Sequence, residues 1–136
     1  MDRKDLQELS KVRLKEATAL LKLGLFDGAY YLAGYSVECA LKACIAKGTQ
    51  RGEFPDRKRV ESSYSHKLRD LIKVAGLEVR FNQAGKDPGF RSNWDVVEAW
   101  TEESRYQRHP PESARKLLMA IGHRQNGVIS WIKRQW

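Results

Sequence analysis

The sequence contains no apolar run long enough to cross a bilayer, and its first ten residues, MDRKDLQELS, lack the apolar stretch of a signal peptide. We therefore expect a cytoplasmic protein with no membrane segment. Only two cysteines occur, Cys39 and Cys44, and they lie five positions apart in one predicted helix, where they face different directions and cannot form a disulfide. Two free thiols are typical of a reducing compartment. We interpret both as core residues rather than reactive nucleophiles.

The sequence also lacks the patterns of several common sites. No segment alternates apolar and polar residues as a half-buried strand does. The three histidines, His66, His109 and His123, are scattered without the cysteine or carboxylate spacing of a metal site. The fragment AGKDPG lacks the upstream glycine and the following Ser or Thr of a phosphate-binding loop. We expect no metal and no other cofactor.

The composition is that of a folded, basic chain. Hydrophobic residues make up 41% and charged residues 31%, which argues against disorder. The length of 136 residues predicts a single domain, residues 1–136. The 25 basic and 17 acidic residues give a net charge of +8. This excess points to a polyanionic partner such as nucleic acid or a nucleotide, but many basic domains bind no anion, and charge alone leaves both alternatives open.

We expect the chain to fold around residues 27–47, DGAYYLAGYSVECALKACIAK. After Asp27 this proline-free segment has only three charged residues, Glu38, Lys42 and Lys47. A helix that is apolar on almost every side is a buried helix. At 100° per residue its polar side chains form one strip along the helix, which comprises Tyr31, Tyr35, Glu38 and Lys42. A buried carboxylate needs a cation or several donors, so the partner of Glu38 is the main question that the sequence poses.

Helical periodicity and helix-ending glycines predict four further helices, at about 2–23, 66–75, 93–100 and 111–136. The connection after Gly24 is short, so the first two helices should form an antiparallel hairpin. Gly122 and Gly127 are expected to weaken or bend the last helix. We therefore predict an all-α, antiparallel up-and-down bundle of four to five helices. Trp131 and Trp136, near the end of the chain, are candidates to cover a partner subunit.

The stretch 48–63 is basic, rich in glycine and longer than connections usually are. It is expected to be a loop. A solvated surface and a nucleic-acid contact are both compatible with its composition, so its role stays open.

Four segments, in this order, resemble the HEPN domain family (higher eukaryotes and prokaryotes nucleotide-binding) in its compact stand-alone form. They are SVECALKACI, SHKLRDLIKVAG, WTEESRY and the helix that begins at a proline after it. The resemblance covers most of the chain and implies a HEPN-like helical bundle that usually forms a homodimer. It also implies a site near the dimer cleft, around the basic residue of the Arg-Tyr segment. Many relatives are metal-independent ribonucleases or toxins encoded beside a small nucleotidyltransferase, and others bind nucleotide or RNA without catalysis.

The family's ribonuclease signature is an Arg, four to six residues and then a His. Here the matching residues are Arg105 and His109, with only three residues between them, so the spacing is one residue short. In an active site His109 would be the base and Arg105 the phosphate clamp. We expect Glu38 to hold the Arg105 guanidinium, either as part of a site or as a buried strut. The binding residues implied are Tyr31, Tyr35, Glu38, Lys42, Arg105 and Tyr106.

Three functions follow as hypotheses. The first is a HEPN protein that binds nucleotide or RNA at a dimer-cleft site and acts with a small nucleotidyltransferase in a toxin–antitoxin pair. The second is an active metal-independent HEPN ribonuclease toxin. The third is a purely structural dimerisation domain. The sequence does not identify the nucleotide, the RNA or the partner protein.

Overall fold

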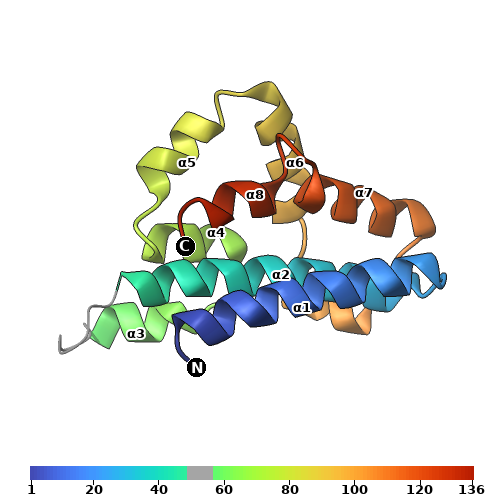
Figure 1. Ribbon diagram of the computed structural model, residues 1–136, viewed down its shortest axis with the longest axis horizontal. Coiled ribbons are helices and arrows are strands. Elements are labelled where there is room, and N and C mark those ends of the chain that lie inside the picture. Colours follow the sequence, from blue (N-terminus) through green and yellow to red (C-terminus); the bar gives the residue numbers. More distant parts are fainter. Residues whose placement is uncertain (49–56) are drawn as a thin grey trace.

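The computed structural model describes residues 1–48 and 57–136, and in these residues it contains helices and no strands. Two long helices, α1 (Arg3–Lys22) and α2 (Phe26–Lys47), lie side by side and antiparallel (Figure 1). The turn between them is closed by Gly24, whose φ of +77° lies in the left-handed region that favours glycine. The predicted α1–α2 hairpin and the all-α class are confirmed.

Helix α2 is the centre of the structure and contacts α1, α4, α7, α8 and the 3₁₀ helix η1. Its small side chains at Ala29, Ala33, Val37 and Ala40 are completely buried. Short side chains let neighbouring helices approach closely. Helices α1 and α2 are close enough for a direct hydrogen bond, in which the Ser10 hydroxyl donates to the Ser36 carbonyl oxygen at 2.7 Å.

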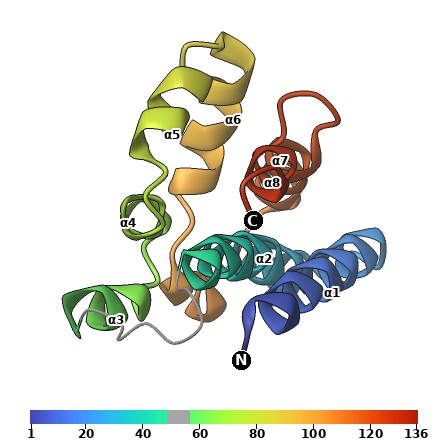
Figure 2. The same ribbon diagram turned by 60° about the vertical axis from the view of Figure 1, so that its left-hand side comes forward.

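Four short helices follow α2 in the described part of the chain. They are α3 (Arg57–Ser63), α4 (Leu68–Val74), α5 (Glu78–Ala84) and α6 (Pro88–Glu98). Two expectations were wrong here: residues 57–63 are helical rather than a loop, and the short helix before Trp100 begins at Pro88, where Asp87 accepts a bond from the Gly89 amide. The rest of the expected loop, 49–56, lies outside the described residues. Helices α5 and α6 both project away from the α1–α2 hairpin (Figure 2), and the Phe81 ring of α5 packs edge-on against Phe90 and Trp94 of α6.

The chain ends in η1 (Glu102–Tyr106), α7 (Pro111–Gly122) and α8 (Val128–Lys133). A single closing helix was therefore a wrong expectation. The helix stops at His123, whose ring Nδ1 accepts hydrogen bonds from the Gln125 and Asn126 amides at 3.2 and 3.0 Å. At Gly127 a Cβ atom would lie 2.3 Å from the His123 carbonyl oxygen, so this tight turn requires glycine. The prediction of four to five helices is too low because α3, α5 and α8 went unrecognised.

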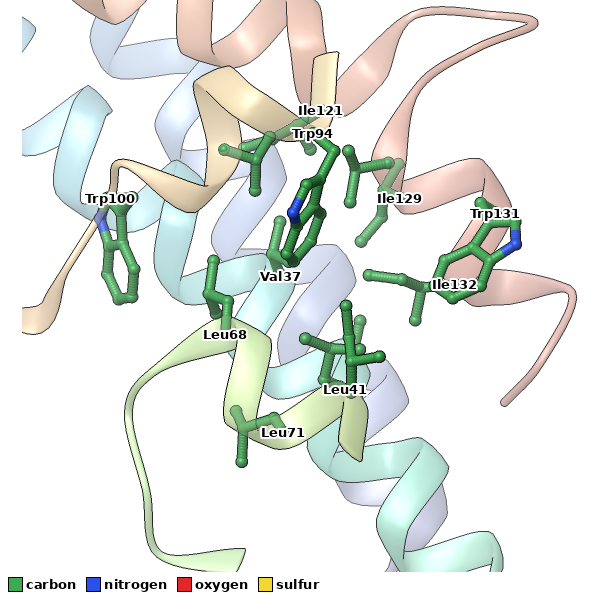
Figure 3. Packing of buried hydrophobic residues seen from close by; sticks show 14 of the residues in the cluster. Val37, Leu41, Leu68, Leu71, Trp94, Trp100, Ile121, Ile129, Trp131 and Ile132 are labelled. Atoms are coloured by element: carbon green, nitrogen blue, oxygen red, sulfur yellow. The ribbon is translucent and has the colours of Figure 1, made fainter. Parts of the chain in front are cut away.

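The core lies between α2 and the helices α4, α6, α7 and α8. Trp94 stands in its middle, among Val37, Ile121 and Ile129 (Figure 3). Trp131 is only 5% exposed and packs edge-on to Phe81, with ring centroids 5.9 Å apart. It fills the chain's own core, so the expectation that it covers a partner subunit was wrong. In the part of the chain described, no helix is both long enough and apolar enough to span a bilayer.

Candidate functional site

The four polar residues predicted on the central helix do share one face of α2, which we call the polar strip: Tyr31, Tyr35, Glu38 and Lys42. The 3₁₀ helix η1 packs along this face, on the side of α2 away from α7 and α8 (Figure 2, where η1 is the orange turn below α2). The turn between α3 and α4 reaches the same face, through His66. The polar strip is therefore the floor of a site whose walls come from two distant parts of the chain.

The buried carboxylate of Glu38, whose side chain is 3% exposed, has two partners. Its Oε1 lies 3.0 Å from His66 Nδ1, and its Oε2 lies 3.3 Å from Lys42 Nζ. The expected pair between Glu38 and Arg105 was wrong. The reason is geometric: η1 directs Arg105 to Tyr31, and seven residues along a helix separate Tyr31 from Glu38 by about 10 Å.

His66 extends this contact beyond α2. Its Nε2 lies 3.2 Å from Oε2 of Glu102, the first residue of η1. One imidazole thus joins α2, the α3–α4 turn and η1. Beside it lies a cavity of about 440 Å³ lined by Ser65, His66, Lys67, Thr101, Glu102 and Glu103.

Arg105 lies at the other end of the polar strip, exposed to solvent. Its guanidinium carbon is 4.8 Å from the centre of the Tyr106 ring, and Tyr106 is 79% exposed. Electrostatic interaction with Tyr106 and then hydrogen bonding to Tyr31 raise the pKa of Arg105 above its usual value. The structure thus brings together three predicted binding residues, Tyr31, Arg105 and Tyr106, and leaves the guanidinium exposed to solvent.

Three aromatic rings, those of Tyr31, Tyr35 and Trp100, stack at this end of the polar strip. The Tyr31 ring stacks with Tyr35 and with Trp100, each at a centroid distance of 6.1 Å. Trp100 is 1% exposed, and its indole N–H has no hydrogen-bond partner among the described residues. Burial, and then the neighbouring Cys39 and Glu38 side chains, raise the pKa of Tyr35, so its hydroxyl stays protonated at neutral pH.

His109, the other residue of the predicted catalytic pair, lies against the start of α2. Its ring stacks on Tyr30, with centroids 3.8 Å apart and planes 14° apart. Its amide donates to Asp27 Oδ1 at 2.6 Å, and its Nε2 lies 3.0 Å from the Ser104 carbonyl oxygen. A shallow cavity of about 400 Å³ adjoins it, lined by residues 24–28, Arg108 and His109. Arg105 and His109 make no hydrogen bond or ring contact with each other, so the structure does not join the two.

The remaining chemical groups near the site are quiet. Within residues 1–48 and 57–136, no three His, Cys, Asp or Glu side chains are arranged to hold a metal ion. Burial raises the pKa of the Cys39 thiol to about 11, with the charge of Glu38 contributing. Burial alone raises the pKa of Cys44 to about 11. Neither thiol is a ready nucleophile.

Sequence reasoning missed the importance of His66 and Glu102. Each looks like an ordinary surface residue in its local context, one before a short helix and the other within a polar turn. The unsatisfied carboxylate of Glu38 was the available signal that a cation had to come from elsewhere. Comparisons of this chain with models of protein families, with curated proteins and with solved structures found no significant match.

Proposed function

We propose that this chain is a HEPN-type domain that binds RNA or a nucleotide at Arg105 and Tyr106. The observation that carries the proposal is the exposed guanidinium of Arg105, which lies over the Tyr106 ring and is hydrogen-bonded to the Tyr31 side chain. An arginine fork matches two phosphate oxygens, and an exposed aromatic ring offers a stacking surface for a base. The net charge of +8 adds a favourable long-range field for a polyanion.

In this proposal the residues of the site have different roles. Arg105 contacts phosphate, Tyr106 stacks on a base, and the more covered Tyr31 orients the guanidinium. Glu38 and Lys42 do not touch the ligand, because the carboxylate is buried and both are occupied with each other. Through His66 they instead hold the opposite end of the polar strip to η1. A homodimer and a small nucleotidyltransferase partner of toxin–antitoxin type remain part of the proposal, and they rest on the resemblance of the sequence to the HEPN family.

One observation favours a ribonuclease as the second candidate. His109 Nε2 lies 3.0 Å from the Ser104 carbonyl oxygen, which can accept a hydrogen bond but not donate one. A neutral imidazole in this contact must therefore carry its hydrogen on Nε2. Its Nδ1 then keeps a free lone pair, as a general base requires. His109 would take the 2′-hydroxyl proton of RNA, and Arg105 would stabilise the charge on phosphate.

Binding is tested with a short fluorescein-labelled single-stranded RNA, by anisotropy at several salt concentrations. Arg105→Ala should weaken binding and lower the salt slope by about 0.7, the value for one phosphate contact on a single strand. Arg124→Ala is the matched control, because Arg124 is an exposed arginine in the α7–α8 turn and its substitution removes the same charge. Equal losses in both variants would show that only net charge matters.

The stacking contact has its own control. Tyr106→Ala should weaken binding by about 1–3 kcal/mol if a base stacks there. Tyr64→Ala removes a tyrosine of similar exposure, 74% against 79%, outside the proposed contact and should change little.

RNA cleavage that is lost in both His109→Ala and Arg105→Ala would establish the ribonuclease instead. Absence of both binding and cleavage would leave the structural dimerisation domain.

A further inference from the structure

We infer that His66 is a positioning residue: in its proton-bearing state it ties η1 to α2, so that the presentation of Arg105 and Tyr106 depends on pH. The inference concerns the regulation of the proposed anion-binding surface and rests on that proposed function. The observations that carry it are the two contacts of one imidazole, His66 Nδ1 to Glu38 at 3.0 Å and His66 Nε2 to Glu102 at 3.2 Å.

The two contacts of His66 differ in kind. The contact to Glu38 is a hydrogen bond, whereas Nε2 lies at ion-pair distance from Glu102. A neutral imidazole has one N–H donor and one acceptor nitrogen, whereas an ionised carboxylate only accepts. With the N–H of a neutral His66 on Nδ1, the Nε2 lone pair would face the Glu102 carboxylate at 3.2 Å. The contact to Glu102 is therefore attractive only when His66 is an imidazolium, and loss of that proton removes the ion pair.

Charged and titratable groups face His66 from each element that packs around it. From α2 it meets Glu38, with Lys42 bonded to the far oxygen of that carboxylate and Tyr35 one turn away. From η1 it meets Glu102, and Glu103 lines the same cavity. The α3–α4 turn itself contributes Lys67. With an imidazolium, the cluster of Glu38, Glu102, Lys42 and His66 is neutral, and without it the cluster holds a net negative charge next to a buried carboxylate.

The contact that is lost is the one to η1. The Glu102 side chain is 43% exposed and can turn to water, whereas the Glu38 side chain, at 3%, cannot. The neutral imidazole therefore keeps its N–H on Nδ1 for Glu38, and Nε2 turns its lone pair towards Glu102. The contact between α2 and η1 through His66 is then repulsive.

Losing this contact changes the anion-binding surface because of the geometry of η1. A 3₁₀ helix has three residues per turn, so Glu102 and Arg105 lie on the same face of η1. The ion pair of Glu102 with His66 thus sets the rotation that places Arg105 beside Tyr31. Five residues of 3₁₀ helix have little stability of their own. Buried Ser104 keeps η1 attached, so loss of the ion pair with His66 loosens η1 without releasing it.

The test compares RNA affinity between about pH 5.5 and 8, the range in which histidines change charge. Wild type should bind up to about 5-fold more weakly at the alkaline end, the range that one partly exposed ion pair accounts for. Glu102→Gln should flatten the profile while keeping strong binding, because the amide donates to the lone pair of a neutral His66. Glu103→Gln is the matched control, since it removes the same charge from the same cavity and should keep the wild-type pH dependence. His66→Gln should also flatten the profile.

A measurement without ligand separates this inference from the proposed function. Hydrogen exchange of the segment 100–108, corrected for the intrinsic effect of pH, should speed up with rising pH in wild type and in Glu103→Gln. In Glu102→Gln it should stay constant. Failure of RNA to bind at any pH, with this exchange pattern intact, would sink the proposed function and leave the role of His66 standing. The same pH profile in wild type, Glu102→Gln and His66→Gln would overturn the role of His66.

Discussion

The indole of Trp100 lies directly on the backbone of Gly34. A Cβ atom at Gly34 would come within 2.2 Å of two ring atoms of Trp100, which is 1% exposed. This contact fixes the end of the α6 segment to α2 and places η1 immediately after it. The glycine is needed for close approach, since its backbone conformation is that of an ordinary helix residue.

Gly34→Ala should therefore destabilise the fold by about 1–3 kcal/mol, because a buried ring and a helix backbone would both have to shift. The measurement is the free energy of unfolding from urea titration. Gly122→Ala is the matched control: nothing lies within 4 Å of its Cβ position, so it should be neutral or stabilise by up to about 1 kcal/mol. Equal effects of the two substitutions would contradict the packing described here.

Glu38→Ala should cost about 1–3 kcal/mol of stability. The substitution leaves Lys42 and His66 without their shared acceptor, although both can partly reach water, which keeps the loss below that of a fully enclosed pair. Glu61→Ala breaks an exposed ion pair with Arg57 and should change stability by less than about 0.5 kcal/mol. Thermal or urea unfolding of both variants distinguishes the buried carboxylate from the surface one.

Asp27→Ala should destabilise the protein by about 1 kcal/mol. Asp27 accepts the His109 amide at 2.6 Å and also lies in the first turn of α2, where a negative charge is favourable. Asp27→Asn keeps the acceptor and loses only the charge, so it should recover more than half of the lost stability. An Asn variant as unstable as the Ala variant would show that the hydrogen bond contributes little.

Both cysteines should react slowly with thiol reagents in the folded protein at pH 8. With a pKa of about 11 in place of the ordinary value of 9.0, each thiol has about a hundredfold less reactive thiolate, and each side chain is also shielded from the reagent. Unfolding in denaturant should restore ordinary reactivity at both positions. Fast labelling of either thiol in native protein would mean that α2 opens readily.

The same two thiols should make stability fall in alkali. Because burial raises the pKa of each thiol in the folded state, the unfolded state loses its thiol protons first. The sign is therefore fixed: this contribution is constant below about pH 9 and is lost as the pH rises towards about 11. A double Cys39→Ala, Cys44→Ala variant, compared with wild type by urea unfolding at pH 8 and pH 10, should show a smaller decline.

Much of the helical framework was predictable from local patterns. The ends of α1 and α2 follow from Gly24 and from apolar spacing, both of which act within a few residues. Helices α3 and α5 escaped prediction because they lack an apolar face: α3 buries no residue and α5 buries only Phe81, whereas the equally short α4 buries three apolar side chains. The weak point expected at Gly122 and Gly127 is a complete break before α8, because the ring of His123 accepts two amides there and Gly127 packs closely against the backbone.

The sequence by itself determined that α2 is buried and that its polar residues share one face, because burial pattern and helical spacing are properties of neighbouring residues. Only the tertiary structure decided which groups meet there. His66 and Glu102 lie 28 and 64 positions beyond Glu38, and hydrogen bonding selects partners by distances of about 3 Å. The i+4 neighbour Lys42 is a local partner of Glu38, but no local pattern encodes the distant one, so the packing of the α3–α4 turn and η1 on α2 decided that His66 and not Arg105 contacts this carboxylate.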